Sequence, residues 1–327
     1  MIRPCSQPER EALGSVAAEL QARGYAVDVE EVAARPSNEP WLAAYAGLTV
    51  VAALALYVAP LATAVLGAVA LVLHARDAEG RPMLRRASCT AVNVVARAPL
   101  AERPALVVVA PSSAAPRRFA ERTQRALTVA LQAAMTLVAA GGAAAWVAEA
   151  ETELPVVVAG ASAAAAAVVA VLAIVLYGSA APVQERPRTL DLLLQLAPDL
   201  REHPVWLVAT GGRRGGMAGI QGVLADHAEA GGAAWLNLEP AAGGTVVAVS
   251  EEGTWRERRA DRFLLGAAEE AGAEVRPYRA APTDATVLLA RRRRALTLLV
   301  PRDGLQHAHA VVLSVTREVA RNAGGRP

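Results

Sequence analysis

The chain has 327 residues, of which 33 are basic, 31 are acidic and 54% are hydrophobic, with only five Trp, five Tyr and two Phe. Every basic residue is Arg, which excludes a Schiff-base lysine and the lysine of a phosphate-binding P-loop. The near-neutral charge gives no general reason to expect a nucleic acid as partner. A charged fraction of 20% indicates that charge-poor segments are concentrated somewhere in the chain.

Three segments lack ionised side chains, and they span residues 41–73, 126–148 and 155–184. A helix needs roughly 20 apolar residues to cross a bilayer, and each segment meets that length. The second and third are separated by a short acidic turn, which predicts a helical hairpin. The first contains Pro60 and forms either one kinked helix or two helices that turn there. Buried helices of a soluble protein are the alternative interpretation.

Arginines crowd the outer ends of these segments and are absent within them, so the positive-inside rule places the polar parts of the chain in the cytoplasm. If the strands predicted at 25–30 and 91–96 pair in one sheet, the first segment crosses the membrane an even number of times. That favours a hairpin turning at Pro60. We expect no cleavable signal peptide in the polar residues 1–40, and a multi-pass protein of the cell membrane with the bilayer as partner.

The two cysteines, Cys5 and Cys89, are far apart in sequence and form no C-x-x-C motif. This spacing predicts neither a disulfide scaffold nor a zinc ribbon. A reducing compartment is the simpler interpretation.

The polar segments predict alternating helices and strands, which is typical of an α/β sheet covered on both faces. We expect strands at 25–30, 91–96, 105–110, 205–210, 233–238, 245–249, 274–278 and 295–300, and helices at 7–23, 189–200, 216–230, 255–271, 286–291 and 310–322. Ligands bind such sheets at the carboxyl ends of the strands. The loops after Ala110, Thr210 and Leu238 are therefore where a functional site is expected.

Four segments in this order resemble metallopeptidase family twenty-eight, the dizinc aminopeptidases: 93–96, 104–110, 205–212 and 235–239. The chain looks most like bacterial membrane-bound members in which helical hairpins interrupt the peptidase domain. The resemblance implies a mixed, mostly parallel central sheet flanked by helices and interrupted by two transmembrane hairpins. The α/β domain would comprise residues 1–40, 75–125 and 178–327, and the hairpins residues 41–74 and 126–177.

The resemblance also implies that the family's chemistry is lost. Pro111 occupies the position of the first histidine ligand, Arg213 that of the general base, and Arg214 that of a glutamate ligand. An arginine can neither ligate zinc nor accept a proton from water. No catalytic residue remains by this interpretation.

Other positions keep residues that could act as ligands. By resemblance, Glu185 lies near the bridging aspartate, Glu239 replaces the second aspartate, and His307 or His309 matches the final histidine, while Asp284 matches an acidic position that does not bind metal. The two histidines would face the same way on an extended segment, or lie in a surface loop. Glu185, Glu239 and His309 could form a single zinc site. Alternatively, Arg213 and Arg214 pair with Glu185 or Glu239 and replace the metal charge.

Two arginine clusters allow weaker hypotheses. Arg213 and Arg214 lie in a glycine-rich loop between a strand and a helix and could bind an anion, although the loop matches no phosphate-binding motif. Residues 291–294 are all arginine and are typical of a solvated helix end or a contact with anionic lipid. Ser112 and Ser113 have no histidine in a recognisable nucleophile arrangement.

We therefore expect a membrane pseudopeptidase without a cofactor that binds or scaffolds a peptide or protein partner and no nucleic acid. Small-residue helix faces, such as the one with Gly160 and Ser162, could hold a subunit. The alternatives are a single-metal zinc hydrolase that uses Glu185, Glu239 and His309, and a small-anion sensor that uses Arg213 and Arg214.

Overall fold

A computed structural model describes most of the chain, and the ranges it describes are 5–35, 39–56, 58–79, 87–113, 121–147, 157, 161, 187–213, 216–241, 244–253, 256–279 and 282–324. The chain divides into two compact units. Unit 1 comprises Met1–Ser37, Arg86–Pro116 and Pro182–Pro327, and unit 2 comprises Asn38–Arg85 and Arg117–Ala181. Each unit is discontinuous in sequence, because the chain leaves unit 1 twice and returns to it.

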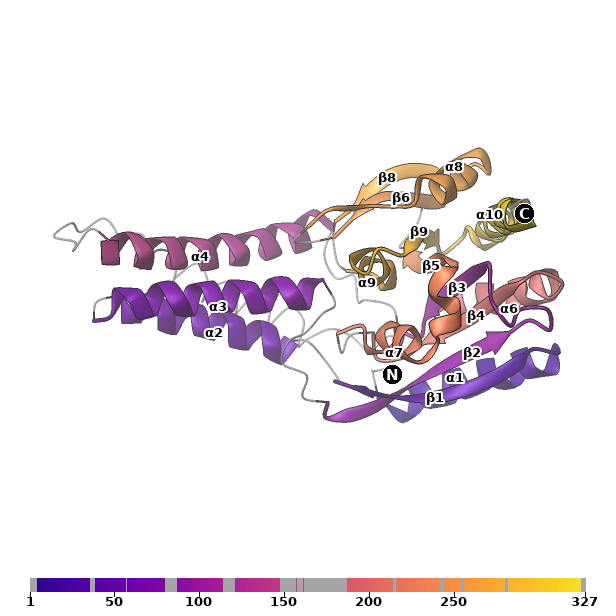
Figure 1. The fold of residues 1–327 in the computed structure, drawn as a ribbon, viewed down its shortest axis with the longest axis horizontal. Coiled ribbons are helices and arrows are strands. Elements are labelled where there is room, and N and C mark those ends of the chain that lie inside the picture. The colour runs from indigo at the N-terminus through magenta and orange to yellow at the C-terminus, as the bar shows by residue number, and fades with distance from the viewer. Residues whose placement is uncertain are drawn as a thin grey trace. The chain divides into compact units, whose positions relative to one another are not determined.

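Unit 1 contains a mixed sheet in the order β1-β2-β4-β3-β5-β9-β6-β7, with β8 paired to β6 (Figure 1). The central neighbours β4, β3, β5 and β9 are parallel, whereas β1, β2 and β6 join them through antiparallel pairs. The strands are β1 (Ala26–Ala34), β2 (Cys89–Arg97), β3 (Leu106–Pro111), β4 (Val205–Thr210), β5 (Ala234–Ala241), β6 (Val247–Glu252), β7 (Arg258–Arg259), β8 (Glu274–Tyr278) and β9 (Arg294–Pro301). The predicted α/β class, with a parallel centre flanked by helices, is confirmed.

Helices cover both faces of this sheet. Helices α1, α6 and α10 pack on one side, and α7 and α9 pack on the other. Their bounds, with those of α8, are α1 (Gln7–Ala22), α6 (Arg188–Leu200), α7 (Ala218–Asp226), α8 (Arg262–Glu270), α9 (Asp284–Ala290) and α10 (Leu305–Gly324). Every residue of β3 and β4 is buried, which explains why these strands read as continuous apolar runs. Trp206 of β4 and Trp235 of β5, both in register with Val107 of β3, are fully buried.

Two helix starts differ from the sequence prediction by five residues or more. The helix expected from residue 255 begins at Arg262, because the Asp261 side chain accepts hydrogen bonds from the backbone N–H groups of Phe263 and Leu264 and caps the helix there. The residues before it form the short strand β7 instead. Helix α10 begins at Leu305 rather than Ala310. His307 and His309 are therefore helical, and the expectation of an extended segment is wrong.

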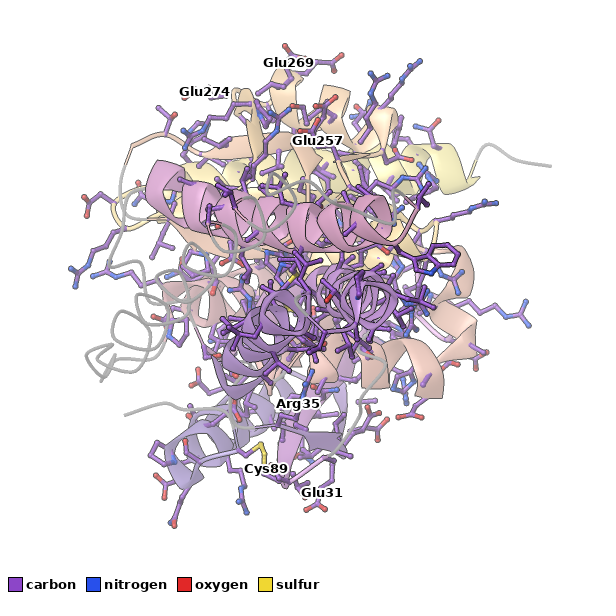
Figure 2. All side chains as sticks on the ribbon, turned by 90° about the vertical axis from the view of Figure 1, so that its left-hand side faces the viewer. Glu31, Arg35, Cys89, Glu257, Glu269 and Glu274 are labelled. Carbon is purple, nitrogen blue, oxygen red and sulfur yellow. A yellow bond between two sulfur atoms is a disulfide. The ribbon has the colours of Figure 1, made fainter. Side chains whose placement is uncertain are left out.

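The cysteines also differ from expectation, because Cys5 and Cys89 form a disulfide with a Cα–Cα distance of 5.9 Å (Figure 2). Strands β1 and β2 pair over their whole length, which sets Cys89 opposite Ala34. Cys5 precedes α1 and packs against a small apolar cluster that contains Ala34 and Ala91. Sequence spacing could not reveal this contact, since 84 residues separate the two cysteines.

Unit 2 contains α2 (Glu39–Ala55), α3 (Pro60–Ala78) and α4 (Glu121–Val147) within its described residues. The first apolar segment thus forms two helices, with Pro60 at the start of the second, where its missing N–H costs nothing. Helices α3 and α4 approach closely through small residues: a Cβ on Gly67 would lie 2.8 Å from the backbone of Ala139, and one on Gly142 would lie 2.5 Å from that of Ala64. Close packing of this kind is frequent between membrane helices.

Within the described ranges, two helices are long and apolar enough to cross a membrane, over Pro60–Asp77 and Val129–Val147, and a shorter apolar helix covers Ala44–Ala55. Large apolar side chains are exposed along their surfaces, including Leu54, Val65, Val72, Leu137 and Val147. The third apolar segment, which includes Gly160 and Ser162, lies almost entirely outside the described residues.

Candidate functional site

A buried polar cluster lies in unit 1 where β4, β5, β6 and α9 meet. It contains Arg213, in the turn after β4, and three acidic residues: Glu239 of β5, Glu252 at the end of β6, and Asp284 at the start of α9. All four side chains are buried. The predicted loop after Thr210 contributes Arg213, whereas β5 continues to Ala241, so Glu239 belongs to the strand and not to a loop after Leu238. Both residues lie near the carboxyl ends of their strands, as the rule for such sheets leads one to expect.

An ion pair between Arg213 and Glu239 forms the centre of this cluster. The Nη1 atom of Arg213 lies 2.6 Å from Oε1 of Glu239, and the two side chains are only 3% and 1% exposed. Burial alone would disfavour the charged guanidinium, but attraction by Glu239 and Asp284 outweighs it and raises the pKa of Arg213 above its usual range. The arginine therefore stays protonated and acts as a fixed internal counter-charge for the carboxylate.

Among the described residues, Glu252 has no such counter-charge in direct contact. Its Oε2 accepts hydrogen bonds from the hydroxyls of Thr283, at 2.6 Å, and Thr297, at 3.2 Å. Burial raises the pKa of Glu252 to about 7 despite these hydrogen bonds. Near neutral pH this carboxyl group is therefore divided between its protonated and ionised forms.

Asp284 closes the cluster on the side of β4. The hydroxyl of Thr210 donates to its Oδ2 at 2.7 Å. Burial raises the pKa of Asp284, and the nearby Arg213 opposes that rise. Thr283 caps the helix that begins at Asp284, because its hydroxyl accepts from the backbone N–H of Thr286. The start of α9 thus supplies the hydroxyl group of Thr283 to Glu252 and the negative charge of Asp284 to Arg213.

Glu9, a fully buried residue of α1, holds the two loops next to this cluster. Its Oε1 accepts from the hydroxyl of Ser112, at 2.6 Å, and from the backbone N–H of Gly212, at 3.1 Å. Its Oε2 accepts from the backbone N–H of Cys5. Sequence analysis missed this role, although Ser6 and Glu9 have the spacing of a capping box and Ser6 does accept from the Glu9 N–H.

Asn93 of β2 makes a similar attachment. Its amide donates to the carbonyl of Gly219, and its Oδ1 accepts from the backbone N–H of Gly211 at 3.1 Å. The two glycines leave room for this approach, because a Cβ on Gly219 would lie 2.4 Å from the carbonyl oxygen of Gly211. The glycine-rich loop is therefore shaped by close backbone packing with β2 and α7.

Of the remaining sequence candidates, those that the structure describes do not gather here. Glu185 and Arg214 lie outside the described residues. His309 pairs with Asp199 of α6 at 3.0 Å, and His307 lies beside Gly272. Pro111 ends β3 and offers no ligand atom from its side chain. Arg213 is already paired with Glu239, so it offers little to an incoming anion.

The described residues do not fit zinc. Within them no group of three or more His, Cys, Asp or Glu side chains could hold a metal ion. Glu239, the acidic residue on the strand where the resemblance places a ligand, is in contact with a guanidinium group instead. A cation bound to that oxygen would have to displace Arg213. The guanidinium group would then be buried beside a second positive charge.

No family model matches the chain, and no curated protein matches it. Similar solved structures include a zinc aminopeptidase from Bacillus subtilis, 9% identical, covering 99% of this chain and 92% of that one with a TM-score of 0.48. An aminopeptidase from Aneurinibacillus sp. strain AM-1 is 11% identical over 100% and 91% of the two chains, with a TM-score of 0.46. A zinc-dependent exopeptidase from Bacteroides vulgatus, so described provisionally, is 9% identical over 96% and 88%, with a TM-score of 0.44. Identities this low leave the chemistry to be inferred from this chain's own residues.

Replacing Arg213 should destabilise the fold strongly. Arg213→Met leaves Glu239 buried without a counter-charge, and we expect the free energy of unfolding to fall by about 3–5 kcal/mol. Adding Glu239→Gln should recover part of that loss, because the orphaned charge is removed. Chemical denaturation of all variants in detergent measures both effects. Arg321→Met, which breaks an exposed pair with Glu318, should change stability by less than about 1 kcal/mol. If the double variant loses as much free energy of unfolding as the two single variants together, the pairing of Arg213 with Glu239 is contradicted.

The protonation of Glu252 should make stability depend on pH. The folded-state pKa of about 7 exceeds the ordinary value of 4.5, so the folded protein retains a proton that the unfolded chain releases. Stability should therefore fall as pH rises from about 4.5 to about 7 and change little above that range from this group. Glu252→Gln should remove this decline, whereas Glu251→Gln, on the adjacent half-exposed residue, should preserve it. Thermal unfolding across this pH range is the measurement, and identical profiles for wild type and Glu252→Gln would exclude the assignment.

Proposed function

We propose that this chain is a membrane protein whose α/β domain is related to the zinc aminopeptidases but has lost hydrolysis, and that it works by binding or scaffolding a peptide or protein partner. The buried ion pair between Arg213 and Glu239 carries the proposal. It supplies to Glu239 the positive charge that a metal would supply in a peptidase, and it does so permanently. A metal-activated water would need both the carboxylate and the adjacent space.

The burial of the whole cluster supports the same proposal. Arg213, Glu239, Glu252 and Asp284 are each 4% exposed or less. Hydrolysis requires a nucleophilic water and a substrate carbonyl to reach the reacting groups. Side chains with so little exposed surface are suited to holding the loops in place, and a partner would then bind the surface of those loops.

The surfaces of α3 and α4 support the membrane part of the proposal. Both helices pass the length required of a membrane span, and roughly a third or less of each apolar window is buried. In a core helix of a soluble protein these side chains would face other protein atoms. Their outward apolar faces would be satisfied by lipid instead. An even number of crossings fits the pairing of β1 with β2, which flank α2 and α3 in sequence.

The proposed loss of hydrolysis can be tested on the purified full chain in detergent. We expect substoichiometric zinc by elemental analysis and no release of aminoacyl-p-nitroanilide above a buffer control, because the positions of the base and two ligands are changed. Glu239→Ala should then leave both readings unchanged. Stoichiometric zinc that disappears in Glu239→Ala, together with turnover, would instead establish the single-metal hydrolase.

The orientation of unit 1 is a separate prediction. Arginine distribution places this unit in the cytoplasm, whereas the disulfide between Cys5 and Cys89 is typical of an oxidising compartment. We propose the cytoplasmic orientation, in which both cysteines are thiols in cells and link upon oxidation. A green fluorescent protein fused to the C-terminus should fluoresce in bacterial cells. An alkaline phosphatase fusion that is active, with a dark fluorescent fusion, would place the unit outside.

A further inference from the structure

A basic pocket lies at the opposite end of α9 from Asp284. Its volume is about 420 Å³, and β7 with its flanking residues forms one wall while the turn between α9 and β9 forms the other. The lining residues are Arg256, Glu257, Arg258, Arg259, Ala260, Asp261, Leu289, Arg292, Arg293 and Arg294. Six arginines against two acids give the lining a formal net charge of +4.

The backbone holds both walls in fixed positions. Asp261 N–H donates to the carbonyl of Ala295, which attaches the segment after β7 to β9. The N–H of Arg293 donates to the carbonyl of Leu288 and closes the end of α9. Arg292 adopts the left-handed region, with φ at +58°, which costs roughly 1 kcal/mol or more for a residue with a side chain. A glycine would adopt this backbone conformation without that cost. The arginine at this position therefore points to a role for its side chain.

Both acids of the pocket are already engaged. The Asp261 carboxylate caps α8 through one oxygen and pairs with Arg294 through the other. Glu257 pairs at 3.0 Å with Arg279, which does not line the pocket. In the described part of the chain, Arg256 and Arg292 form no ion pair and both are exposed, while Arg293 contacts the carbonyl of Gly231. Arg259 pairs at 3.3 Å with Glu251, which does not line the pocket. Among the described residues, uncompensated positive charge therefore remains at Arg256 on one wall and at Arg292 on the other.

These charges define the chemistry of a ligand. A phosphate monoester carries a charge of about −1.5 to −2 at neutral pH, so two phosphate groups would balance a pocket of charge +4. Guanidinium groups bind phosphate through paired, charge-assisted hydrogen bonds. The apolar lining residues are Ala260 and Leu289, and among the described residues the lining contains no aromatic side chain on which a nucleobase could stack.

We propose that this pocket binds a ligand that carries two or more phosphate groups, either free or as the headgroup of a lipid. The alternative is that the arginines only stabilise the carboxyl end of α9, and it accounts for fewer of the arginines than phosphate binding does. That effect falls off within one helical turn. It applies to the wall formed by residues 292–294, whereas Arg256, Arg258 and Arg259 come from the separate segment around β7.

Calorimetric titration of the full chain in detergent with inorganic tripolyphosphate tests the proposal. We expect binding that weakens with added salt, because the contacts are ionic. The variant Arg256→Gln/Arg292→Gln should lose about tenfold or more in affinity. Arg276→Gln/Arg317→Gln changes the net charge equally at two exposed arginines outside the pocket and should bind within about twofold of wild type. Circular dichroism melting of each variant verifies that it is folded.

The source of the phosphate groups is separated by competition. A short-chain lipid with a bisphosphorylated inositol headgroup and the corresponding soluble inositol phosphate are each titrated against bound tripolyphosphate. Stronger displacement by the lipid identifies a membrane ligand, and equal displacement identifies a soluble one; both outcomes support the pocket. Absence of tripolyphosphate binding at millimolar concentration, or equal losses in the two double variants, overturns the proposal.

Discussion

A charge buried in protein must be paired, and this requirement governs the centre of unit 1. Arg213 and Glu239 satisfy it for each other at 2.6 Å, while Glu252 and Asp284 satisfy it by hydrogen bonds from threonines and by holding their protons more tightly. The cluster is thus a set of acids stabilised by one guanidinium and by neutral donors. Each acid has one carboxyl oxygen paired within the protein, while Oε1 of Glu252 and Oδ1 of Asp284 are buried without a hydrogen-bond partner among the described residues.

Two buried side chains fix the loops after β3 and β4 beside this cluster. Glu9 fastens the ends of β3 and β4 to the start of α1, and Asn93 fastens the glycine-rich loop to β2. Both side chains are fully buried, so loss of either hydrogen-bonding set would leave backbone groups without partners. Ser112 and Gly212, the positions where the chain leaves β3 and β4, are therefore held by buried hydrogen bonds.

Much of this fold follows from local sequence, whereas the contacts at its centre do not. Continuous apolar runs identified β3 and β4, and leucines on one face identified α6, because burial imposes those patterns directly. The sequence allowed Arg213 or Arg214 to pair with Glu185 or Glu239, and the structure contains the pair of Arg213 with Glu239. The roles of Glu9 and Glu252 could not be foreseen, since their partners lie 203 and 31 residues away and only the folded sheet brings them together. The disulfide escaped prediction for the same reason.

The pairing of β1 with β2 has a consequence for how the two units are joined. Their register runs without interruption from Ala26 opposite Arg97 to Ala34 opposite Cys89, so α2 and α3 occupy what is, for the sheet, the loop of an ordinary β-hairpin. A longer loop adds little to the cost of closing it, about 0.6 kcal/mol for each doubling of its length. The stability of the β1–β2 pairing therefore depends little on the length of the segment between the two strands. Replacing residues 35–88 by a tight turn would graft the two strands together and yield a shorter chain in which the sheet keeps its register while one of the apolar insertions is gone.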